Sequence, residues 1–324
     1  QVSALTTSQV VAFGTQQVLA LGTRQIPALT SMQASSLTTV QLRVLGVAQL
    51  SAFETVDLQA LTSAQVSAFG TDQMQLFPTS QLAMLTTGQV SVLTTGQVQA
   101  LTTVGLSALT TGQLVALTTG QVRALTVSQV AGFGAARVQY LTTGQVASLS
   151  TVQVQALTTA EVAGLTSVQA AALTTQQVAA LTLLQVKALE TGDLQALTTV
   201  QMGGFGSTQL QGMLTTQVSA LTTTQVVVLT SAQALGLSAL QVAALTTAQV
   251  AALTTAQVSA LAAVQVSALE TVDIQALGSA QLLALETGDL QALTTAQVRA
   301  LQTGQLVVFA TGQVAALLPA QVSV

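Results

Sequence analysis

The residues in this chain best suited to chemistry are carboxylates that occur in pairs. Eight of the ten acidic residues form four pairs, in which a Glu precedes an Asp by three residues: Glu54/Asp57, Glu190/Asp193, Glu270/Asp273 and Glu286/Asp289. Such carboxylates can share a Ca²⁺ ion or take part in acid–base chemistry. A calcium ion takes more oxygens than one pair supplies. We therefore interpret the pairs as helix-start acids, favoured there by the helix dipole, and expect no metal site.

Other catalytic groups are scarce. The chain has no histidine and no cysteine, so the commonest general base, the thiol nucleophile and the most frequent metal ligands are missing. Serine and threonine are plentiful, but they lack a base to activate them, and no glycine-rich phosphate loop follows a strand. We therefore predict that the chain is not an enzyme, that it has no catalytic or cofactor-binding residues, and that it takes no small-molecule substrate.

The composition limits the possible partners. Half of the 324 residues are apolar and only 5% are charged, whereas ordinary globular proteins carry about a quarter charged residues. Six basic residues against ten acidic ones leave no basic patch for nucleic acid. Thr and Gln interrupt each apolar run well before the roughly 18 residues of a membrane span. We expect the apolar surface to be buried against the chain itself or against other copies.

The whole chain is a tandem array of one octapeptide. It divides from Gln1 into forty octads and four further residues, without an insertion or a deletion. Typical copies are Q-V-Q-A-L-T-T-V (97–104) and Q-V-A-A-L-T-T-A (241–248). An unbroken period of this kind is typical of a solenoid, in which each repeat stacks on its neighbours. We predict one continuous solenoid over residues 1–324, as a segment of a longer or processed protein.

One short helix per octad fits the sequence best. The run L-T-T-x-Q-V places Thr at the N-cap and Gln at the third helical position, which is a capping box flanked by an apolar staple. Pro319 occupies position 7 of its octad, the first helical position in this phasing. Gly14 and Gly46 at position 6 suit the residue that ends a helix. Pro27, at position 3, would lie inside its helix but close to the start.

The alternative is a β-solenoid with two octads per coil, in which Q-V-x-A-L is the strand and T-T-x the turn. Val and Thr favour strands. However, the apolar set at positions 2, 4 and 5, which we predict to be the core, does not alternate strictly. We favour the α solenoid of short one-helix repeats and keep the β-solenoid as the alternative.

Two exceptions to the consensus inform the packing. The seven Phe residues all lie at position 5, and none is followed by Thr, which indicates volume exchange in a close-packed interior. Four basic residues lie at position 3, which marks that position as facing solvent: Arg43, Arg123, Lys187 and Arg299.

The motif L-T-T-x-Q-V-x-A-L, as in residues 93–101, resembles the octapeptide arrays of very long surface and secreted proteins of Gram-negative bacteria. Those proteins are often described as adhesin-like or haem-utilisation-like, and the resemblance implies an extracellular or cell-surface, fibrous role. The start L-T-x-x-Q-V also resembles the helix-opening segment of TAL-effector repeats. Those repeats are longer and form a basic superhelix, so DNA binding is not carried over.

These observations favour a structural protein. A surface of Thr, Gln, Ala and Gly with few charges is poorly protected against association. We predict self-association into an extracellular filament, sheath or tube. The alternatives are a passive spacer in a giant bacterial adhesin and, less favoured, ligand binding by the threonine array, as on ice, glycans or calcium. Two adjacent Thr on a strand would point to opposite faces, which argues against a flat binding rank.

Overall fold

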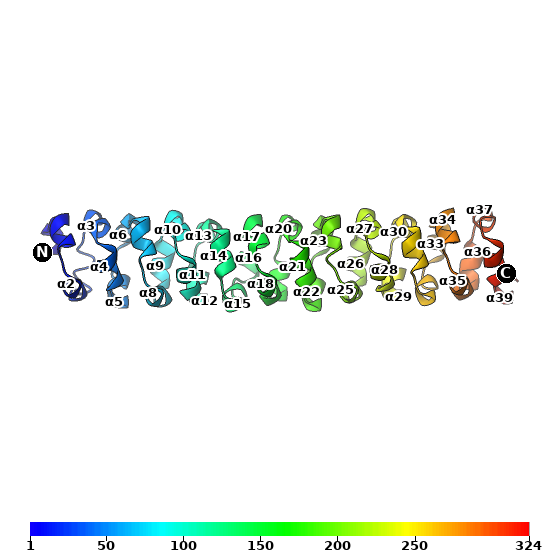
Figure 1. Cartoon of the computed structure of the whole chain (residues 1–324), viewed down its shortest axis with the longest axis horizontal. Helices are drawn as coiled ribbons and strands as arrows, with labels where there is room; N and C mark the ends of the chain where they lie inside the picture. Colours follow the sequence, from blue (N-terminus) through cyan, green and yellow to red (C-terminus); the bar gives the residue numbers. More distant parts are fainter. Residues whose placement is uncertain (324) are drawn as a thin grey trace. The chain divides into compact units, whose positions relative to one another are not determined.

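The computed structural model describes residues 1–323 and shows a helical solenoid (Figure 1). Within this part of the chain there are thirty-nine α-helices of four to six residues, one 3₁₀ helix (η1, Val2–Ala4) and no strand. The predicted α solenoid of one-helix octads is therefore confirmed, and the β-solenoid alternative with two octads per coil is wrong. The chain divides into two compact units, Gln1–Gly164 and Leu165–Val324, which are described separately.

The first unit contains nineteen α-helices among its described residues. Their bounds are α1 Thr7–Val11, α2 Thr15–Leu19, α3 Ser31–Ser36, α4 Thr39–Arg43, α5 Val47–Ser51, α6 Thr55–Ala60, α7 Ser63–Ser67, α8 Thr71–Gln75, α9 Thr79–Met84, α10 Thr87–Ser91, α11 Thr95–Ala100, α12 Thr103–Ala108, α13 Thr111–Ala116, α14 Thr119–Ala124, α15 Val127–Val130, α16 Ala135–Val138, α17 Thr143–Ser148, α18 Thr151–Ala156 and α19 Thr159–Ala163.

The second unit contains the remaining helices of the described chain. Their bounds are α20 Ser167–Ala172, α21 Thr175–Ala180, α22 Leu183–Ala188, α23 Thr191–Ala196, α24 Thr199–Met202, α25 Ser207–Gly212, α26 Thr215–Ala220, α27 Thr223–Val227, α28 Ser231–Leu235, α29 Ala239–Ala243, α30 Thr247–Ala252, α31 Thr255–Ser259, α32 Ala263–Val266, α33 Thr271–Ala276, α34 Ser279–Leu283, α35 Thr287–Ala292, α36 Thr295–Ala300, α37 Thr303–Leu306, α38 Thr311–Ala316 and α39 Pro319–Val322.

Each octad supplies one helix and the bend that leads to the next. In the octad around α11, Thr94 is the N-cap in an extended conformation, and its hydroxyl accepts a hydrogen bond from the backbone N–H of Gln97 at 3.2 Å. The helix ends at Ala100, and Leu101 returns to extended backbone (φ −60°, ψ 137°). Two extended residues between successive helices turn the chain, so helices of this length follow one another without a longer loop. The predicted capping box is confirmed.

Successive turns stack at a register of three and four octads. Helix α8 packs against α11, and α11 packs against α14, so each helix contacts the one three octads later. Hydrogen bonds described below join octads four apart. A turn of the solenoid therefore contains between three and four octads. In Figure 1, α3, α6, α10 and α13 accordingly follow one another along one edge of the first unit.

The core consists of positions 1, 2 and 5. Val98 at position 2 is completely buried, Leu101 at position 5 is 3% exposed, and Gln97 at position 1 is 1% exposed. Ala100 at position 4 is only half-buried. The prediction of a core at positions 2, 4 and 5 was thus wrong in two respects. The alanine faces the helix flank, and a polar glutamine takes the buried place because all its polar atoms find partners there.

The predicted burial of phenylalanine at position 5 is confirmed in the inner turns. Phe53, Phe69, Phe77, Phe133 and Phe205 are all buried. The rings of Phe69 and Phe77, from consecutive octads, lie 5.6 Å apart at a tilt of 60°. Centroid distances of this size are typical of favourable aromatic pairs.

Two expectations about helix ends need correction. Pro27 does not lie inside a helix, because residues 23–28 form only turns. Proline has no N–H to donate to the carbonyl four residues before it and its ring crowds that carbonyl, so the helix does not form. Gly14 and Gly46 do not end helices in the left-handed region. They are N-caps with negative φ (−70° and −81°), in the place that Thr takes in other octads.

Candidate functional site

In most octads a buried glutamine at position 1 connects two helices. The side-chain oxygen of Gln97 accepts a hydrogen bond from the N–H of Thr94 at 2.8 Å, which caps the start of its own helix, α11. Its amide nitrogen donates to the carbonyls of Val66 and Phe69, both at 2.9 Å, at the end of α7, four helices earlier. A single side chain therefore caps the N-terminus of one helix and the C-terminus of another.

This double cap explains why such short helices form. A helix leaves its first N–H groups and its last carbonyls without partners, and a helix of four to six residues is unstable alone. In an interior that excludes water, each group without a partner costs about 1–3 kcal/mol. The glutamine removes this cost at both ends, and it does so by bonding to the neighbouring turn. Local structure and turn stacking are therefore formed by the same side chain.

The same geometry recurs in both units. In the first unit, Gln121 caps Thr118 at 2.7 Å and donates to Val90 at 2.9 Å. In the second, Gln249 caps Thr246 at 2.7 Å and donates to Val218 at 3.1 Å. We call the series of these position-1 glutamines the glutamine ladder. The sequence analysis missed its second function, although the near constancy of Gln at position 1 was the signal for it.

Seven octads depart from the ladder at position 1: Asp57, Gly105, Arg137, Glu161, Asp193, Asp273 and Asp289. The simplest is Gly105, which has no side chain to make either connection. Its N–H still donates to the hydroxyl of Thr102 at 2.9 Å, so half of the capping box remains. The other six carry charges, and a charge can perform only one of the two functions of an amide.

Arg137 performs the donor half alone. Its guanidinium donates to the carbonyl of Leu109 at 2.9 Å and to that of Ser107, which is the register that glutamine uses. It has no acceptor for its N-cap residue, Gly134. The N–H of Gly134 instead donates to Oε1 of Glu161 at 2.7 Å, in α19, three helices later. Burial lowers the pKa of Arg137 from its usual value, and its Nε has no hydrogen-bond partner among the described residues.

Glu161 performs the acceptor half. Its Oε2 accepts from the N–H of Thr158 at 2.8 Å, as a glutamine oxygen would, while Oε1 reaches back to Gly134. Gly134 has φ +79°, and within residues 1–323 no other residue has a positive φ. Glycine is the residue that adopts this conformation without steric cost. The residue with the positive φ, Gly134, is thus also the one whose N–H needs an acceptor from outside its own helix.

The predicted acidic pairs are N-cap and third-helical residues, with the Glu exposed and the Asp buried. Asp57 is 2% exposed and Asp193 is 3% exposed. Their Oδ1 atoms accept from the hydroxyls of Ser31 at 2.8 Å and Ser167 at 2.9 Å, on the turn before. Their Oδ2 atoms are buried and have no hydrogen-bond partner among the described residues. A helix-start role accounts for the Asp positions but not for these oxygens.

The other two Asp residues cap their helices. Oδ2 of Asp273 accepts from the N–H of Glu270 at 3.1 Å, and Oδ2 of Asp289 accepts from the N–H of Glu286 at 3.0 Å. Burial raises the pKa of Asp289 above its ordinary value; the N–H of Glu286 opposes this shift and the Glu286 charge adds to it. Asp273 also accepts from the hydroxyl of Thr247 at 3.0 Å.

The pKa of Asp193 is raised in the same way. Burial is the main cause, the hydrogen bond from Ser167 opposes it, and repulsion by Glu190 adds to it. Residues 1–323 contain no group of three or more Asp or Glu side chains placed to hold a metal ion. Any cation bound at one of the pairs would therefore need oxygens from other groups.

Comparison with known proteins supports the repeat assignment. The sequence profile of the ALTTAQ repeat matches residues 1–31, 50–87, 90–127, 119–151, 151–183, 186–223 and 282–318, which is well over half of the chain. The chain belongs to the ALTTAQ repeat family. The predicted resemblance to tandem octapeptide arrays is thereby confirmed at the level of the repeat. A search of curated proteins found no match.

The ALTTAQ octads present their variable positions to solvent. The four basic residues at position 3 are exposed, as predicted, and Arg43 donates to the carbonyl of Ala68 at 3.0 Å. Position 8 is also exposed and carries large apolar side chains in several octads, among them Met32 at 75% and Leu240 at 76% exposed. Within residues 1–323 no helix has the length and apolar character to cross a membrane.

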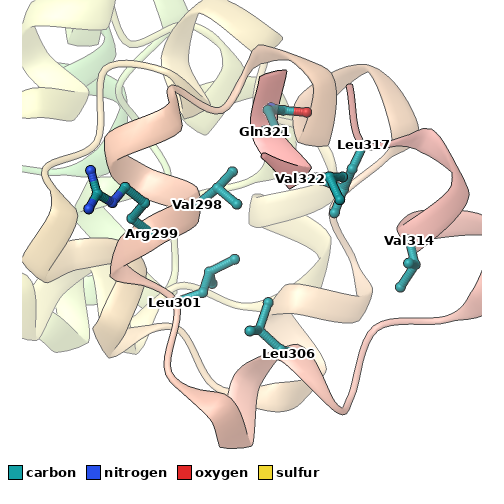
Figure 2. A pocket seen from close by; sticks show the side chains of 8 residues that line it. All are labelled: Val298, Arg299, Leu301, Leu306, Val314, Leu317, Gln321 and Val322. Atoms are coloured by element: carbon teal, nitrogen blue, oxygen red, sulfur yellow. The ribbon is translucent and has the colours of Figure 1, made fainter. Parts of the chain in front are cut away.

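A cavity of about 340 Å³ lies within the last ALTTAQ octads (Figure 2). Figure 2 shows Val298, Leu301 and Leu306 facing Val314 and Val322 across the opening. These are residues of positions 2 and 5. Their counterparts in inner turns are buried because a further turn covers them, whereas Leu306 and Val314 are 43% and 51% exposed. The cavity is therefore uncovered repeat core, without the converging polar groups of a ligand pocket.

Proposed function

We propose that this chain is a structural protein that forms or extends an extracellular filament, sheath or tube by self-association. The observation that carries the proposal is the set of large apolar side chains exposed at position 8 in several octads. In the second unit these are Leu184, Val200, Leu240 and Val264, which are 68%, 72%, 76% and 63% exposed. Exposed apolar side chains of this size, repeated along a surface with few charges, favour contacts between copies.

The internal structure supports a mechanical role. Each octad is bonded only to octads at most four away, through the glutamine ladder and the buried residues of positions 2 and 5. Stability in such a repeat is approximately a sum of local and nearest-neighbour contributions, so octads can be added without changing those already present. Identical outward positions then give many equivalent weak contacts, whose effects add along the surface.

The proposal is tested by changing position 8 without changing the fold. Threonine already occurs at this position, in Thr208 and Thr224. A quadruple variant therefore replaces the four apolar residues of the second unit by threonine: L184T, V200T, L240T and V264T. We expect wild-type chains to assemble as their concentration rises, in sedimentation velocity and negative-stain electron microscopy, and the variant to assemble only at a concentration several-fold higher.

A matched control changes four exposed threonines at position 7 to serine: T215S, T223S, T255S and T295S. It changes the same number of exposed residues in the second unit but leaves the apolar side chains in place, so it should assemble like the wild type. Circular dichroism verifies equal helix content in all three proteins. Dispersed wild-type monomers at high concentration, or equal assembly of the position-8 variant and the control, would show that position 8 does not drive association.

The second candidate is a passive spacer in a giant adhesin, which is favoured by the local character of the glutamine ladder. A spacer needs a length that can vary and a surface that resists association. The sequence of the full-length protein and the assembly experiment discriminate the two, because a spacer stays monomeric and is joined to a dedicated binding domain. In both cases we propose a non-enzymatic protein, since the chain has neither His nor Cys. We place it in the extracellular space or at the cell surface, as in the octapeptide arrays that its repeat resembles.

A further inference from the structure

The octad of Glu54 and Asp57 brings acceptors together without a donor. In the ladder, a glutamine nitrogen meets the carbonyls 28 and 31 residues before it, as Gln89 does with Leu61 at 2.9 Å. At Asp57 the equivalent carbonyl, 28 residues before, belongs to Leu29. No group in residues 1–323 donates to that carbonyl or to Oδ2 of Asp57. A buried carboxylate oxygen and a carbonyl oxygen thus occupy a region that elsewhere contains an N–H donor.

The hydroxyl of Ser31 places the carboxylate on this side of the helix. Its hydrogen bond to Oδ1 of Asp57, 2.8 Å long, holds the carboxylate against the turn that contains Leu29, two residues before the serine. Aspartate is one methylene shorter than glutamine, so its carboxylate reaches less far toward this turn than a glutamine amide would. The buried Oδ2 has no donor, which is costly unless a positive group lies beside it.

The paired glutamate adds a second negative charge. Glu54 replaces the Thr N-cap, and its side chain makes no cap hydrogen bond, so this octad lacks both halves of the reciprocal capping box. Like charges three residues apart on a helix are unfavourable. In this chain every position-1 Asp is accompanied by a Glu at position 6, and Glu does not occur at position 6 in any other octad. A cation held by both carboxylates would offset the repulsion between Glu54 and Asp57.

We propose that Glu54 and Asp57 bind a calcium ion together with the main-chain carbonyl of Leu29. Ca²⁺ takes six to eight oxygens, from carboxylates, backbone carbonyls and water, in flexible geometry. The carbonyl and the buried Oδ2 supply the oxygens that the carboxylate pair lacks when the sequence is considered alone. The exposed carboxylate of Glu54 and water complete the shell on the solvent side, and two carboxylates balance the charge of the ion.

Glu190 and Asp193 form a second site of the same kind. Oδ2 of Asp193 has no partner among the described residues, and its Oδ1 accepts from Ser167 at 2.9 Å. The carbonyl of Leu165, 28 residues before Asp193, has no donor within the described chain. Asp273 and Asp289 differ, because their Oδ2 atoms cap the helix and are occupied. The structure therefore assigns calcium to the first two pairs and not to the last two.

The experiment titrates the full chain with CaCl₂ after treatment with chelator, using isothermal calorimetry and thermal unfolding. Variant one restores the consensus in the two proposed sites: E54T/D57Q with E190T/D193Q. The matched control restores it in the other two: E270T/D273Q with E286T/D289Q. All substituted residues are those of ordinary octads, so both variants are expected to fold. We expect two calcium ions per wild-type and control chain, with a dissociation constant up to about 1 mM, and a rise of a few degrees in unfolding temperature.

Variant one should show neither heat of binding nor a shift with calcium. Absence of calcium binding by the wild-type chain in the millimolar range overturns the proposal, as does an unchanged response of variant one. A wild-type chain that is insensitive to calcium but gains stability in acid would overturn the proposal and show that a proton, carried by Asp193, supplies a missing donor instead. An equal loss of response in the control would place binding at all four pairs and contradict the assignment.

Discussion

Arg137 and Glu161 share between them the two hydrogen-bonding functions that one glutamine performs elsewhere in the chain. Arg137 donates to the carbonyls of the earlier turn, and Glu161 accepts the N–H of Gly134, which the arginine leaves uncapped. The two residues lie at the same octad position, three octads apart. In this pair, a donor-only and an acceptor-only side chain together satisfy the carbonyl and the N-cap groups that a glutamine satisfies alone.

The relation predicts non-additive substitutions. R137Q and E161Q alone should each destabilise the turn by about 1 kcal/mol. In R137Q the new glutamine competes with the buried carboxylate of Glu161 for the N–H of Gly134, and in E161Q that N–H loses its carboxylate acceptor. The double variant R137Q/E161Q restores glutamine at position 1 of both octads and should be as stable as the wild type. Hydrogen–deuterium exchange of residues 130–165 measures the local stability. A double-mutant cycle with a coupling near zero would show that the two residues act independently.

In the R137Q/E161Q variant, position 134 should no longer require glycine. At φ +79° an alanine is strained, so G134A in the wild type should cost about 1–2 kcal/mol. In R137Q/E161Q, the side chain of residue 137 can accept the N–H of residue 134, and the backbone can return to the extended N-cap conformation seen at Gly46. There G134T should be neutral or stabilising. Equal destabilisation by G134A and G134T in both backgrounds would contradict this explanation.

The donor half of the ladder is tested by a change of one atom. Q121E keeps the acceptor for Thr118 but places a carboxylate against the carbonyls of Val90 and Leu93, so it should destabilise by about 3 kcal/mol at neutral pH. Burial raises the pKa of the introduced carboxyl in the folded state, so stability should return as the pH falls through that value. The exposed Gln99 provides the control, and Q99E should have little effect on urea unfolding at any pH.

Replacing Gly105 by glutamine should increase the stability of the chain. G105Q adds both connections of the ladder and removes a helical glycine, so we expect a stabilisation of about 1–2 kcal/mol. A Cβ at this position would lie 3.2 Å from a methyl of Leu82. Leu106 and Gln129 have the same separation in sequence and are both buried, so we expect a leucine and a glutamine to be compatible at this register. A lower unfolding temperature for G105Q would mean that Leu82 cannot move aside.

The buried carboxyls predict a specific dependence on pH. Asp193 and Asp289 have pKa values raised above the ordinary value, so the folded chain binds their protons more tightly than the unfolded chain does. These groups therefore lower stability above their folded pKa, and the loss disappears as the pH falls through it. In chelator, D193N/D289N should be more stable than the wild type at pH 7 and equal to it at about pH 3. Urea unfolding at both pH values measures the difference. A variant less stable than the wild type at pH 7 would mean that the carboxylates are favourable as charges.

Much of the local structure is determined by neighbours in the sequence. The Thr cap and the glutamine that answers it lie three residues apart, as in Thr94 and Gln97, so the helix start is evident from the octad alone. The same holds for Pro319 at the first helical position. These features depend on contacts within one repeat, and the unbroken period then implies that all repeats stack alike.

The tertiary structure decided the features that depend on contacts between residues 24 to 32 positions apart in the sequence. The number of octads per turn, the burial of Gln97 and the partners of its nitrogen follow from the carbonyls of Val66 and Phe69, which no local pattern identifies. The role of Glu161 was hidden for the same reason, since its second partner, Gly134, lies on another turn. The sequence of an octad therefore specifies its own helix. The partners of its buried polar side chain depend on the turn against which it packs.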